Sequence, residues 1–573
     1  MDTGYGYHAE LIQRHIELVP GYAAVREALT SDIDVGSDTL REVLGAAATF
    51  AEERLVPMNI AGDRQGCRLE EGRVRMPDAY KPVWAELAGN GWNSVDQPTR
   101  FGGQGLPAFV NAGCRELFDR ACMAVGMLTG PTRAGTLVLL EFADETLQQE
   151  WIPKFVSGQW SATICISEAD AGSDVGRIRT RAVRGEDGAW MVTGEKMWTS
   201  FGDNDLVERI GHLMLARTPD APAGSAGLSL FLVPSNVRDG VGNWVSNGVT
   251  PRRIEEKLGL HGSPTCAMGF ENSRAYLLGE VNRGLPQMFV MIQSMRLMVA
   301  IEGVGISFGA EQTALRYAAD RRQGGASSRP PVTINSHADI QRQLLSMAAR
   351  VEVLRALVYE LAVRIDAERT GVATTAAHAN VTQWLLPIVK ASCAEAAFDV
   401  PNAAIQVLGG AGYTQEWPCE QWLRDARMMS IAEGSTGIQA LDLVHRRLLK
   451  DGGRTLSHFI ETVYREVSSA DRSLAEPAVN VIERLKNAGA TLLSWAGQPR
   501  DIEAGAVAFL HLSMLACTAW MAVRIAHGES NDAIGRRLAA AGRFWLHDLD
   551  ARAAFHEAEI LRGAERLGEF QNI

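Results

Sequence analysis

The stretch SATICISEADAGSD, residues 161–174, marks the point at which the hydrophobic pattern of the chain changes. Before it, over residues 38–160, apolar side chains recur at three- and four-residue steps, which is typical of amphipathic helices. From residue 161 onward, short apolar runs are separated by Gly, Asp and Pro, and this favours an antiparallel β domain over βαβ units. Helical periodicity returns at about residue 283 and continues to the end. The pattern predicts an α+β fold that is mainly helical.

These changes of period predict five segments along the chain. They are a loosely ordered N-terminal extension (1–37), an N-terminal helical domain (38–160), a middle β domain (161–282), a C-terminal helical bundle (283–450) and an additional helical domain (451–573). The expected strands include 161–167, 189–193, 213–217, 228–233 and 266–270, and an exposed loop is expected over 321–331. Residues 288–306 are apolar nearly all round, so we expect a central buried helix there.

Composition excludes several classes of protein. With 573 residues, 46% of them apolar and 22% charged, the chain is typical of a folded protein of several domains. Its 56 basic and 68 acidic residues give a net charge of −12, which argues against nucleic acid or anionic lipid as a partner. The eight cysteines are scattered without a CxxC pair, so neither a metal site nor a disulfide framework is expected. Such thiols, with no secretory signal visible, favour a cytoplasmic protein.

The run 506–523 bears on whether the chain enters a membrane. It contains no formally charged residue over 18 positions and is close to spanning length. His511, Ser513 and several alanines interrupt it, and Arg524 follows directly. A buried helix inside a bundle explains this composition better than a membrane span. We therefore predict no integral membrane insertion.

Two motifs near the start of the β domain are candidates for ligand contacts. Residues 165–174 leave an apolar run and enter a loop of small residues, where backbone groups can approach a planar or phosphate-bearing ligand closely. An ordinary β-turn is the alternative. In the second motif Trp198 is followed by hydroxyl residues, and such a Trp can pack on a flat ring. Its alternative is a core Trp.

A third region contains a candidate general base. Glu433 stands between Ile431-Ala432 and Gly434-Ser435, and the segment 406–413 precedes it with three glycines. A carboxylate at an apolar helix break can have a raised pKa and remove a proton from carbon. A Glu that only ends a helix is the alternative. The glycines at 409, 410 and 412 are not a dinucleotide fingerprint, because no strand precedes them.

Taken together and in this order, the three regions resemble the acyl-CoA dehydrogenase family of flavoenzymes. The resemblance covers about residues 40–450. It rests on Glu168-Ala169-Asp170-Ala171-Gly172-Ser173-Asp174, Lys196-Met197-Trp198, Gln406-Val407-Leu408-Gly409-Gly410 and Glu433-Gly434-Ser435. The longer format, with segments 62–66 and 261–265 and a C-terminal extension, is similar to the 3-methylmercaptopropionyl-CoA dehydrogenase subgroup.

The resemblance implies an FAD-dependent oxidation of an acyl-CoA thioester to the trans-2-enoyl-CoA, with Glu433 as the base. It implies FAD contacts at Ser167, Ser173, Trp198, Ser200, Arg321, Gln406, Gly410 and Ser435, and acyl-CoA contacts at Ser173, Arg296 and Gly434. Arg321, Gln406 and Gly410 would reach the FAD of a neighbouring subunit, which implies a homodimer or a dimer of dimers. The expected electron acceptor is an electron-transferring flavoprotein.

Departures from the family pattern leave the acyl group open. Ala432 stands where an aromatic residue is common, and Gly437 where a polar one is common. We expect a short or medium acyl group such as 3-methylmercaptopropionyl, with a longer fatty acyl chain as the alternative. Glu302 is a second candidate base, whereas Met295 occupies the position of the base in some relatives.

Three other functions compete with this reading. A flavin oxidase that discharges to oxygen is one, and a membrane-associated very-long-chain enzyme anchored through 506–523 is another. The third is a dehydrogenase-like binding scaffold of the kind that associates with DNA, and the slightly acidic block 451–573 argues against it.

Overall fold

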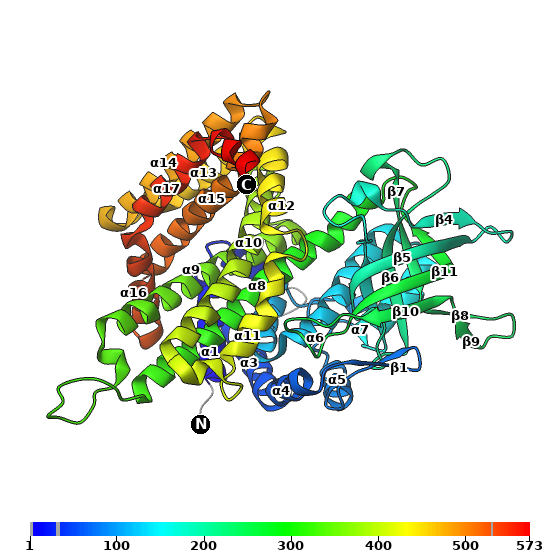
Figure 1. Ribbon diagram of the computed structural model, residues 1–573, viewed down its shortest axis with the longest axis horizontal. Helices are drawn as coiled ribbons and strands as arrows, with labels where there is room; N and C mark the ends of the chain where they lie inside the picture. The colour runs from blue at the N-terminus through cyan, green and yellow to red at the C-terminus, as the bar shows by residue number, and fades with distance from the viewer. Residues whose placement is uncertain (1–3, 30–34, 529–530) are drawn as a thin grey trace. The chain divides into compact units, whose positions relative to one another are not determined.

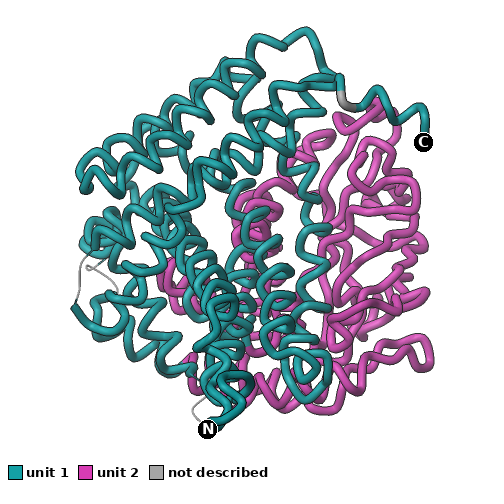
Figure 2. The backbone as a smooth tube through the Cα atoms, turned by 60° about the vertical axis from the view of Figure 1, so that its left-hand side comes forward, with its two compact units in different colours: residues 1–46, 112–120, 299–573 teal, residues 47–111, 121–298 magenta. Residues whose placement is uncertain are grey.

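The structure is a computed structural model that describes residues 4–29, 35–528 and 531–573. The chain forms two compact units, coloured separately in Figure 2. The helical unit consists of Met1–Ala46, Ala112–Arg120 and Val299–Ile573, and the sheet unit consists of Ala47–Asn111 and Ala121–Met298. The predicted boundaries between the five segments are sequence boundaries and stay a prediction.

A seven-stranded sheet forms the centre of the sheet unit (Figure 1). Its strands are β3 (Trp160–Cys165), β4 (Arg181–Arg184), β5 (Trp190–Ser200), β6 (Arg209–Arg217), β7 (Leu228–Pro234), β10 (Val249–Ile254) and β11 (Thr265–Leu278). The order is β10-β11-β5-β4-β6-β3, and β7 pairs with both β11 and β6. Two short hairpins, β1–β2 (Arg68–Glu70, Arg73–Arg75) and β8–β9 (Asn236–Arg238, Trp244–Ser246), and the helices α4 (Val56–Gln65), α5 (Tyr80–Gly89) and α7 (Glu145–Val156) complete the unit.

The prediction of a middle β domain is confirmed, and most of its strand pairs are antiparallel as expected, but the pairs that β6 makes with β3 and β4 are parallel. β3 pairs with β6 in parallel, from Trp160 opposite Arg209 to Cys165 opposite Met214, and β4 also meets β6 in parallel. The remaining pairs of this sheet are antiparallel. β3 follows the helix α7 rather than a hairpin turn, so its direction is not fixed by the strand beside it.

Helices of widely different length form most of the helical unit. They are α1 (Tyr5–Glu17), α2 (Tyr22–Leu29), α9 (Ala338–Arg369), α10 (Ala376–Leu408), α11 (Cys419–Ala426), α12 (Thr436–Leu441), α13 (Arg454–Val467), α14 (Arg472–Ser494), α15 (Pro499–His527), α16 (Ala533–His547) and α17 (Leu549–Leu561). Three further helices contribute residues to both units, α3 (Ser37–Phe50), α6 (Ala108–Phe142) and α8 (Gly284–Asp320). The C-terminal block is helical as predicted, with α14, α15 and α17 packed side by side (Figure 1).

The run 506–523 lies within α15, where 89% of the most apolar window is buried inside the fold. This confirms the prediction of a buried helix. Two other helices in the described part of the chain, α6 and α8, are also long and apolar enough to cross a membrane, and their windows are 78% and 72% buried.

The N-terminal extension is not loosely ordered, and that expectation is wrong for residues 5–29. α1 and α2 pack against α9. His8 contacts the Glu116 carboxylate at 2.7 Å and His15 contacts that of Glu352 at 2.8 Å, all four side chains being buried. Burial lowers the pKa of His8 to about 3, so this imidazole is neutral and its contact is a hydrogen bond to a charged carboxylate.

Candidate active site

In the sheet unit, the loop after β3 is held against β5 through a buried lysine. Lys196 Nζ donates to Glu168 Oε1 at 2.8 Å and to the carbonyls of Ile166 and Leu215 at 3.0 Å. The backbone N–H of Met197 donates to the carbonyl of Ser167 at 3.0 Å. These contacts bring Ser167 next to the strand that carries Trp198 and Ser200. Such proximity is required if all three residues bind the same ligand, as the sequence predicts.

The charges of this pair follow from their surroundings. Burial tends to raise the pKa of Glu168, but Lys196 and the hydrogen bonds from Thr180 and the Arg179 N–H outweigh it and lower that pKa. Burial in turn lowers the pKa of Lys196. Glu168 is therefore a structural carboxylate that fixes the loop. Ser173, five residues further on, lies exposed on the same loop.

Trp198 is the most unusual residue of β5. Its side chain is 57% exposed and its backbone has φ of 60°. A non-glycine residue in this left-handed region costs about 1 kcal/mol, so the surrounding strands must hold it there. Ser200, half-buried, pairs with Thr265 of β11 two residues further along. An exposed indole with hydroxyl groups beside it fits a planar, hydrogen-bonding ring such as a flavin.

In the helical unit, Glu433 occupies the connection between Arg427–Ser430 and α12. Its φ is 55° and that of Gly434 is 90°, so two consecutive residues are left-handed. The Glu433 side chain is half-buried, and Ser435 precedes the first turn of α12. The sequence pattern of a carboxylate at a helix break is therefore present, while its role as a base stays a prediction.

A further carboxyl group, that of Glu302, lies within the electrostatic range of Glu433, and Asp119 lies within that of Glu302. Glu302 on α8 is fully buried, and its pKa is raised well above the usual value by burial and then by the charges of Asp119 and Glu433. Burial also raises the pKa of Asp119 to about 6, although Arg115 opposes this. Arg115 donates to Asp119 at 2.5 Å and lies 3.9 Å from Glu302. Burial therefore favours the protonated form of both Glu302 and Asp119.

Lys390, which is not among the residues predicted from the sequence, is 1% exposed on α10. Its Nζ donates to the backbone carbonyls of Met429, Ala432 and Gly434, each at 2.8 Å. The only sequence signal is a single charge inside the apolar run 384–394, since its acceptors are backbone atoms that no residue type reveals.

The other predicted contacts are spread over both units. Arg321, which follows the end of α8, is exposed, as are Gln406 near the end of α10 and Gly410 just beyond it. Arg296 lies buried in the part of α8 that belongs to the sheet unit. Each unit is defined separately, so the predicted common site of these residues stays a prediction.

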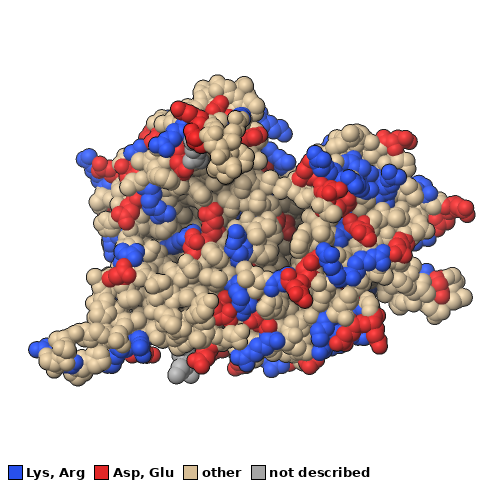
Figure 3. Space-filling model, viewed as in Figure 1, with Lys and Arg blue, Asp and Glu red and all other residues tan. Residues whose placement is uncertain are grey.

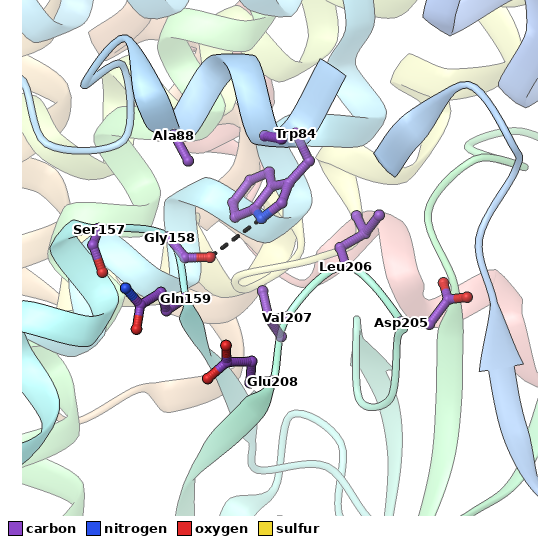
Figure 4. Close-up of a pocket in the computed structure, with 10 residues that line it drawn as sticks. Trp84, Ala88, Ser157, Gly158, Gln159, Asp205, Leu206, Val207 and Glu208 are labelled. Carbon is purple, nitrogen blue, oxygen red and sulfur yellow. Dashed lines mark hydrogen bonds between the residues drawn. The ribbon is translucent and has the colours of Figure 1, made fainter. Parts of the chain in front are cut away.

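The sheet unit contains an open pocket, shown in Figure 4. Trp84, Gly158 and residues 205–208 line it, and Trp84 Nε1 donates to the carbonyl of Gly158 at 3.2 Å. None of the residues predicted to bind FAD or acyl-CoA is among its lining residues.

The described part of the chain contains no group of three or more His, Cys, Asp or Glu that could hold a metal ion. Basic and acidic side chains are interspersed on the face in Figure 3.

Three family models match successive parts of the chain. They describe the N-terminal domain of acyl-CoA dehydrogenase (residues 37–159), its middle domain (163–273) and its C-terminal domain (282–449). Together they span most of the chain up to residue 449.

Two relatives are similar over most of their length. A 3-methylmercaptopropionyl-CoA dehydrogenase of Ruegeria pomeroyi is 38% identical over 508 residues, which is 86% of each chain. The broad-specificity linear acyl-CoA dehydrogenase FadE5 of Mycobacterium tuberculosis is 34% identical over 459 residues, 77% of this chain and 74% of its own.

Solved structures share the fold at lower sequence identity. Caenorhabditis elegans ACDH-11 in complex with C11-CoA has a TM-score of 0.79 and 19% identity, covering 95% of this chain and 91% of its own. An acyl-CoA dehydrogenase of Bacillus anthracis complexed with FAD has a TM-score of 0.74 and 19% identity, covering 93% and 89%. The likeness extends into the C-terminal helices.

Proposed function

The chain belongs to the acyl-CoA dehydrogenase family, and from this premise we propose that it oxidises an acyl-CoA thioester to the trans-2-enoyl-CoA with Glu433 as the base. As a family member it is an FAD-dependent oxidoreductase that acts on acyl-CoA. The observation that carries the proposal is the backbone of Glu433. Glu433 carries a half-buried carboxylate, and both Glu433 and Gly434 have left-handed backbone conformations. Such backbone strain costs free energy and is concentrated at functional sites.

In the proposed reaction Glu433 removes the proton from the α carbon of the substrate. Its backbone N–H donates to the thioester carbonyl, so that the negative charge that develops on that oxygen is stabilised as the proton leaves. Bound substrate would exclude water from around the Glu433 carboxylate, which strengthens its electrostatic interaction with the reacting atoms. The product carries a double bond between the α and β carbons.

Trp198, Ser167 and Ser200 would hold the flavin ring, because the indole is exposed and the hydroxyl residues lie beside it on adjoining strand ends. FAD, when bound there, accepts the hydride from the β carbon of the substrate. Ser173 and Arg296 would contact the CoA portion, and Ser435 the FAD diphosphate or ribose.

We further propose a short or medium acyl group such as 3-methylmercaptopropionyl. The support is the 38% identity to a dehydrogenase of that name, over 86% of both chains. FadE5, named for broad specificity on linear acyl-CoA, supports a longer chain as the alternative. Ala432 and Gly437 replace an aromatic and a polar residue that are common in the family, and this would widen the acyl pocket for either.

The same proposal includes the setting of the enzyme. Electrons pass to an electron-transferring flavoprotein, and the enzyme is a cytoplasmic homodimer or dimer of dimers. Exposed Arg321, Gln406 and Gly410 support the dimer, since all three are accessible to a neighbouring subunit.

Anaerobic titration of the purified holoenzyme tests the reaction. The flavin absorbance near ~450 nm is followed while 3-methylmercaptopropionyl-, butyryl-, octanoyl- and palmitoyl-CoA are added in turn. Bleaching by one or two of them supports the reaction and identifies the acyl group. A yellow protein that none of the four bleaches contradicts the proposal. Hydrogen peroxide yield per turnover in air separates a dehydrogenase from an oxidase.

A further inference from the structure

We propose that Lys390 and Gln439 are positioning residues. They hold residues 429–434, called the Glu433 loop, in the conformation that places Glu433 for reaction. The inference rests on the proposed function, in which Glu433 supplies both the base and a backbone donor. It assigns a role to two buried side chains on different helices, α10 and α12, neither of which reacts with substrate.

Lys390 donates three hydrogen bonds to the backbone around Glu433. An ammonium group has three N–H donors and no acceptor. Its three 2.8 Å contacts go to the carbonyls of Met429, Ala432 and Gly434, which lie on both sides of Glu433. A buried charged donor makes stronger hydrogen bonds than a neutral one. A single ammonium group therefore holds the backbone both before and after Glu433.

Gln439, on the helix that follows the loop, donates hydrogen bonds to the same loop. Its Nε2 donates to the carbonyls of Glu433 and Gly434, each at 3.0 Å, and the side chain is fully buried. It also packs closely on Gly434, where an added Cβ would lie 2.8 Å from Nε2. The carbonyl of Gly434 thus accepts from both Lys390 and Gln439.

The backbone explains why two anchors are needed. Left-handed residues persist only when their surroundings over-determine them, and here two are consecutive. Releasing the carbonyls would let Glu433 relax, which moves the carboxylate and the backbone N–H together. Displacement of a reacting group by about 1 Å can cost on the order of 10²-fold in rate.

The experiment compares Lys390→Met and Gln439→Met with wild type, using holoenzyme and the substrate that bleaches the wild-type flavin. Ser392→Ala is the matched control, because Ser392 is buried on the same helix but donates to the carbonyl of Ile388 within that helix. Four quantities are measured, namely flavin content, kcat, KM, and amide hydrogen exchange of residues 429–434 without substrate.

We expect full flavin content and a KM within about threefold of wild type in both variants. kcat falls by about 10²-fold in Lys390→Met and about 10-fold in Gln439→Met, since transition-state contacts are lost while ground-state binding is kept. Exchange at 429–434 rises by at least about 10-fold, and Ser392→Ala matches wild type throughout.

A folded, yellow variant with kcat within about threefold of wild type and unchanged exchange overturns the inference. If Lys390→Met does not fold, Gln439→Met decides by the same criteria. A wild-type enzyme that no acyl-CoA reduces contradicts the proposed function, whereas unchanged exchange in the variants contradicts the anchoring alone.

Discussion

Replacing Arg355 by Met tests the buried ion network that fixes the N-terminal helices to the helical unit. Arg355 is fully buried on α9, and its Nε donates to Glu116 Oε1 at 2.8 Å while Nη1 donates to Glu352 Oε2 at 2.6 Å. Burial tends to raise the pKa of Glu116, but Arg355 first, with His8 and Tyr359, lowers it to about 2. The carboxylate is thus ionised in the fold and depends mainly on this guanidinium.

The magnitude follows from what remains after the substitution. Glu352 keeps Arg537 and His15, whereas among the described residues Glu116 keeps the hydrogen bonds from His8 and Tyr359 alone. Removing one partner of a buried pair costs about 3–5 kcal/mol, because it leaves a buried charge uncompensated. For a unit of this size each kcal/mol lowers the unfolding midpoint by roughly 1–2 °C, so we expect a fall of roughly 5 °C.

Thermal unfolding followed by circular dichroism at pH 7 measures this change. Arg350→Met is the matched control on the same helix, since its ion pair with Asp399 is partly exposed and is worth less than about 1 kcal/mol. The stability that ionised Glu116 contributes is present above about pH 4.5 and is lost as pH falls towards 2. The unfolding midpoints of Arg355→Met and of the Arg350→Met control should therefore converge in acid. A midpoint for Arg355→Met equal to that of the Arg350 control at pH 7 would refute the reasoning.

Two further variants probe other buried charges. Glu302→Gln should gain stability over wild type as pH rises from about 4.5 through neutrality, because the raised pKa keeps Glu302 protonated in the fold while the unfolded chain releases that proton. Unfolding midpoints at pH 5 and pH 8 measure it, and an equal difference at both pH values counts against the argument. Arg524→Met removes the contacts of α15 with Glu360 at 2.8 Å and Glu466 at 2.6 Å. We expect a loss of about 3–5 kcal/mol and faster proteolysis within 451–573, and an unchanged digestion pattern would contradict this.

The order of helical and β segments could be predicted from the sequence because apolar periodicity is a local signal. The strands that were not predicted lack this apolar periodicity. β10 contains Pro251 and two arginines, which are tolerated because it lies at the edge of the sheet. The parallel pairing of β3 was also missed, since strand direction depends on the connection and not on the pattern.

The N-terminal helices and the anchors of the Glu433 loop were missed for a different reason. His8 and His15 stand where an apolar stripe would be expected, and only their buried carboxylate partners far along the chain explain them. Lys390 binds backbone carbonyls about forty residues away, which no side-chain motif records. Glu433 itself was identifiable because its apolar neighbours and the following glycine are local.

Glu433→Gln provides the most direct test of the central claim. The variant keeps the shape of the side chain and the backbone N–H but cannot accept the α proton. In anaerobic rapid mixing with the best acyl-CoA, we predict a yellow protein with wild-type flavin content whose reduction is slower by at least about 10⁴-fold, the upper range for loss of an acid–base group. Reduction of the flavin at a rate near that of wild type would contradict the account.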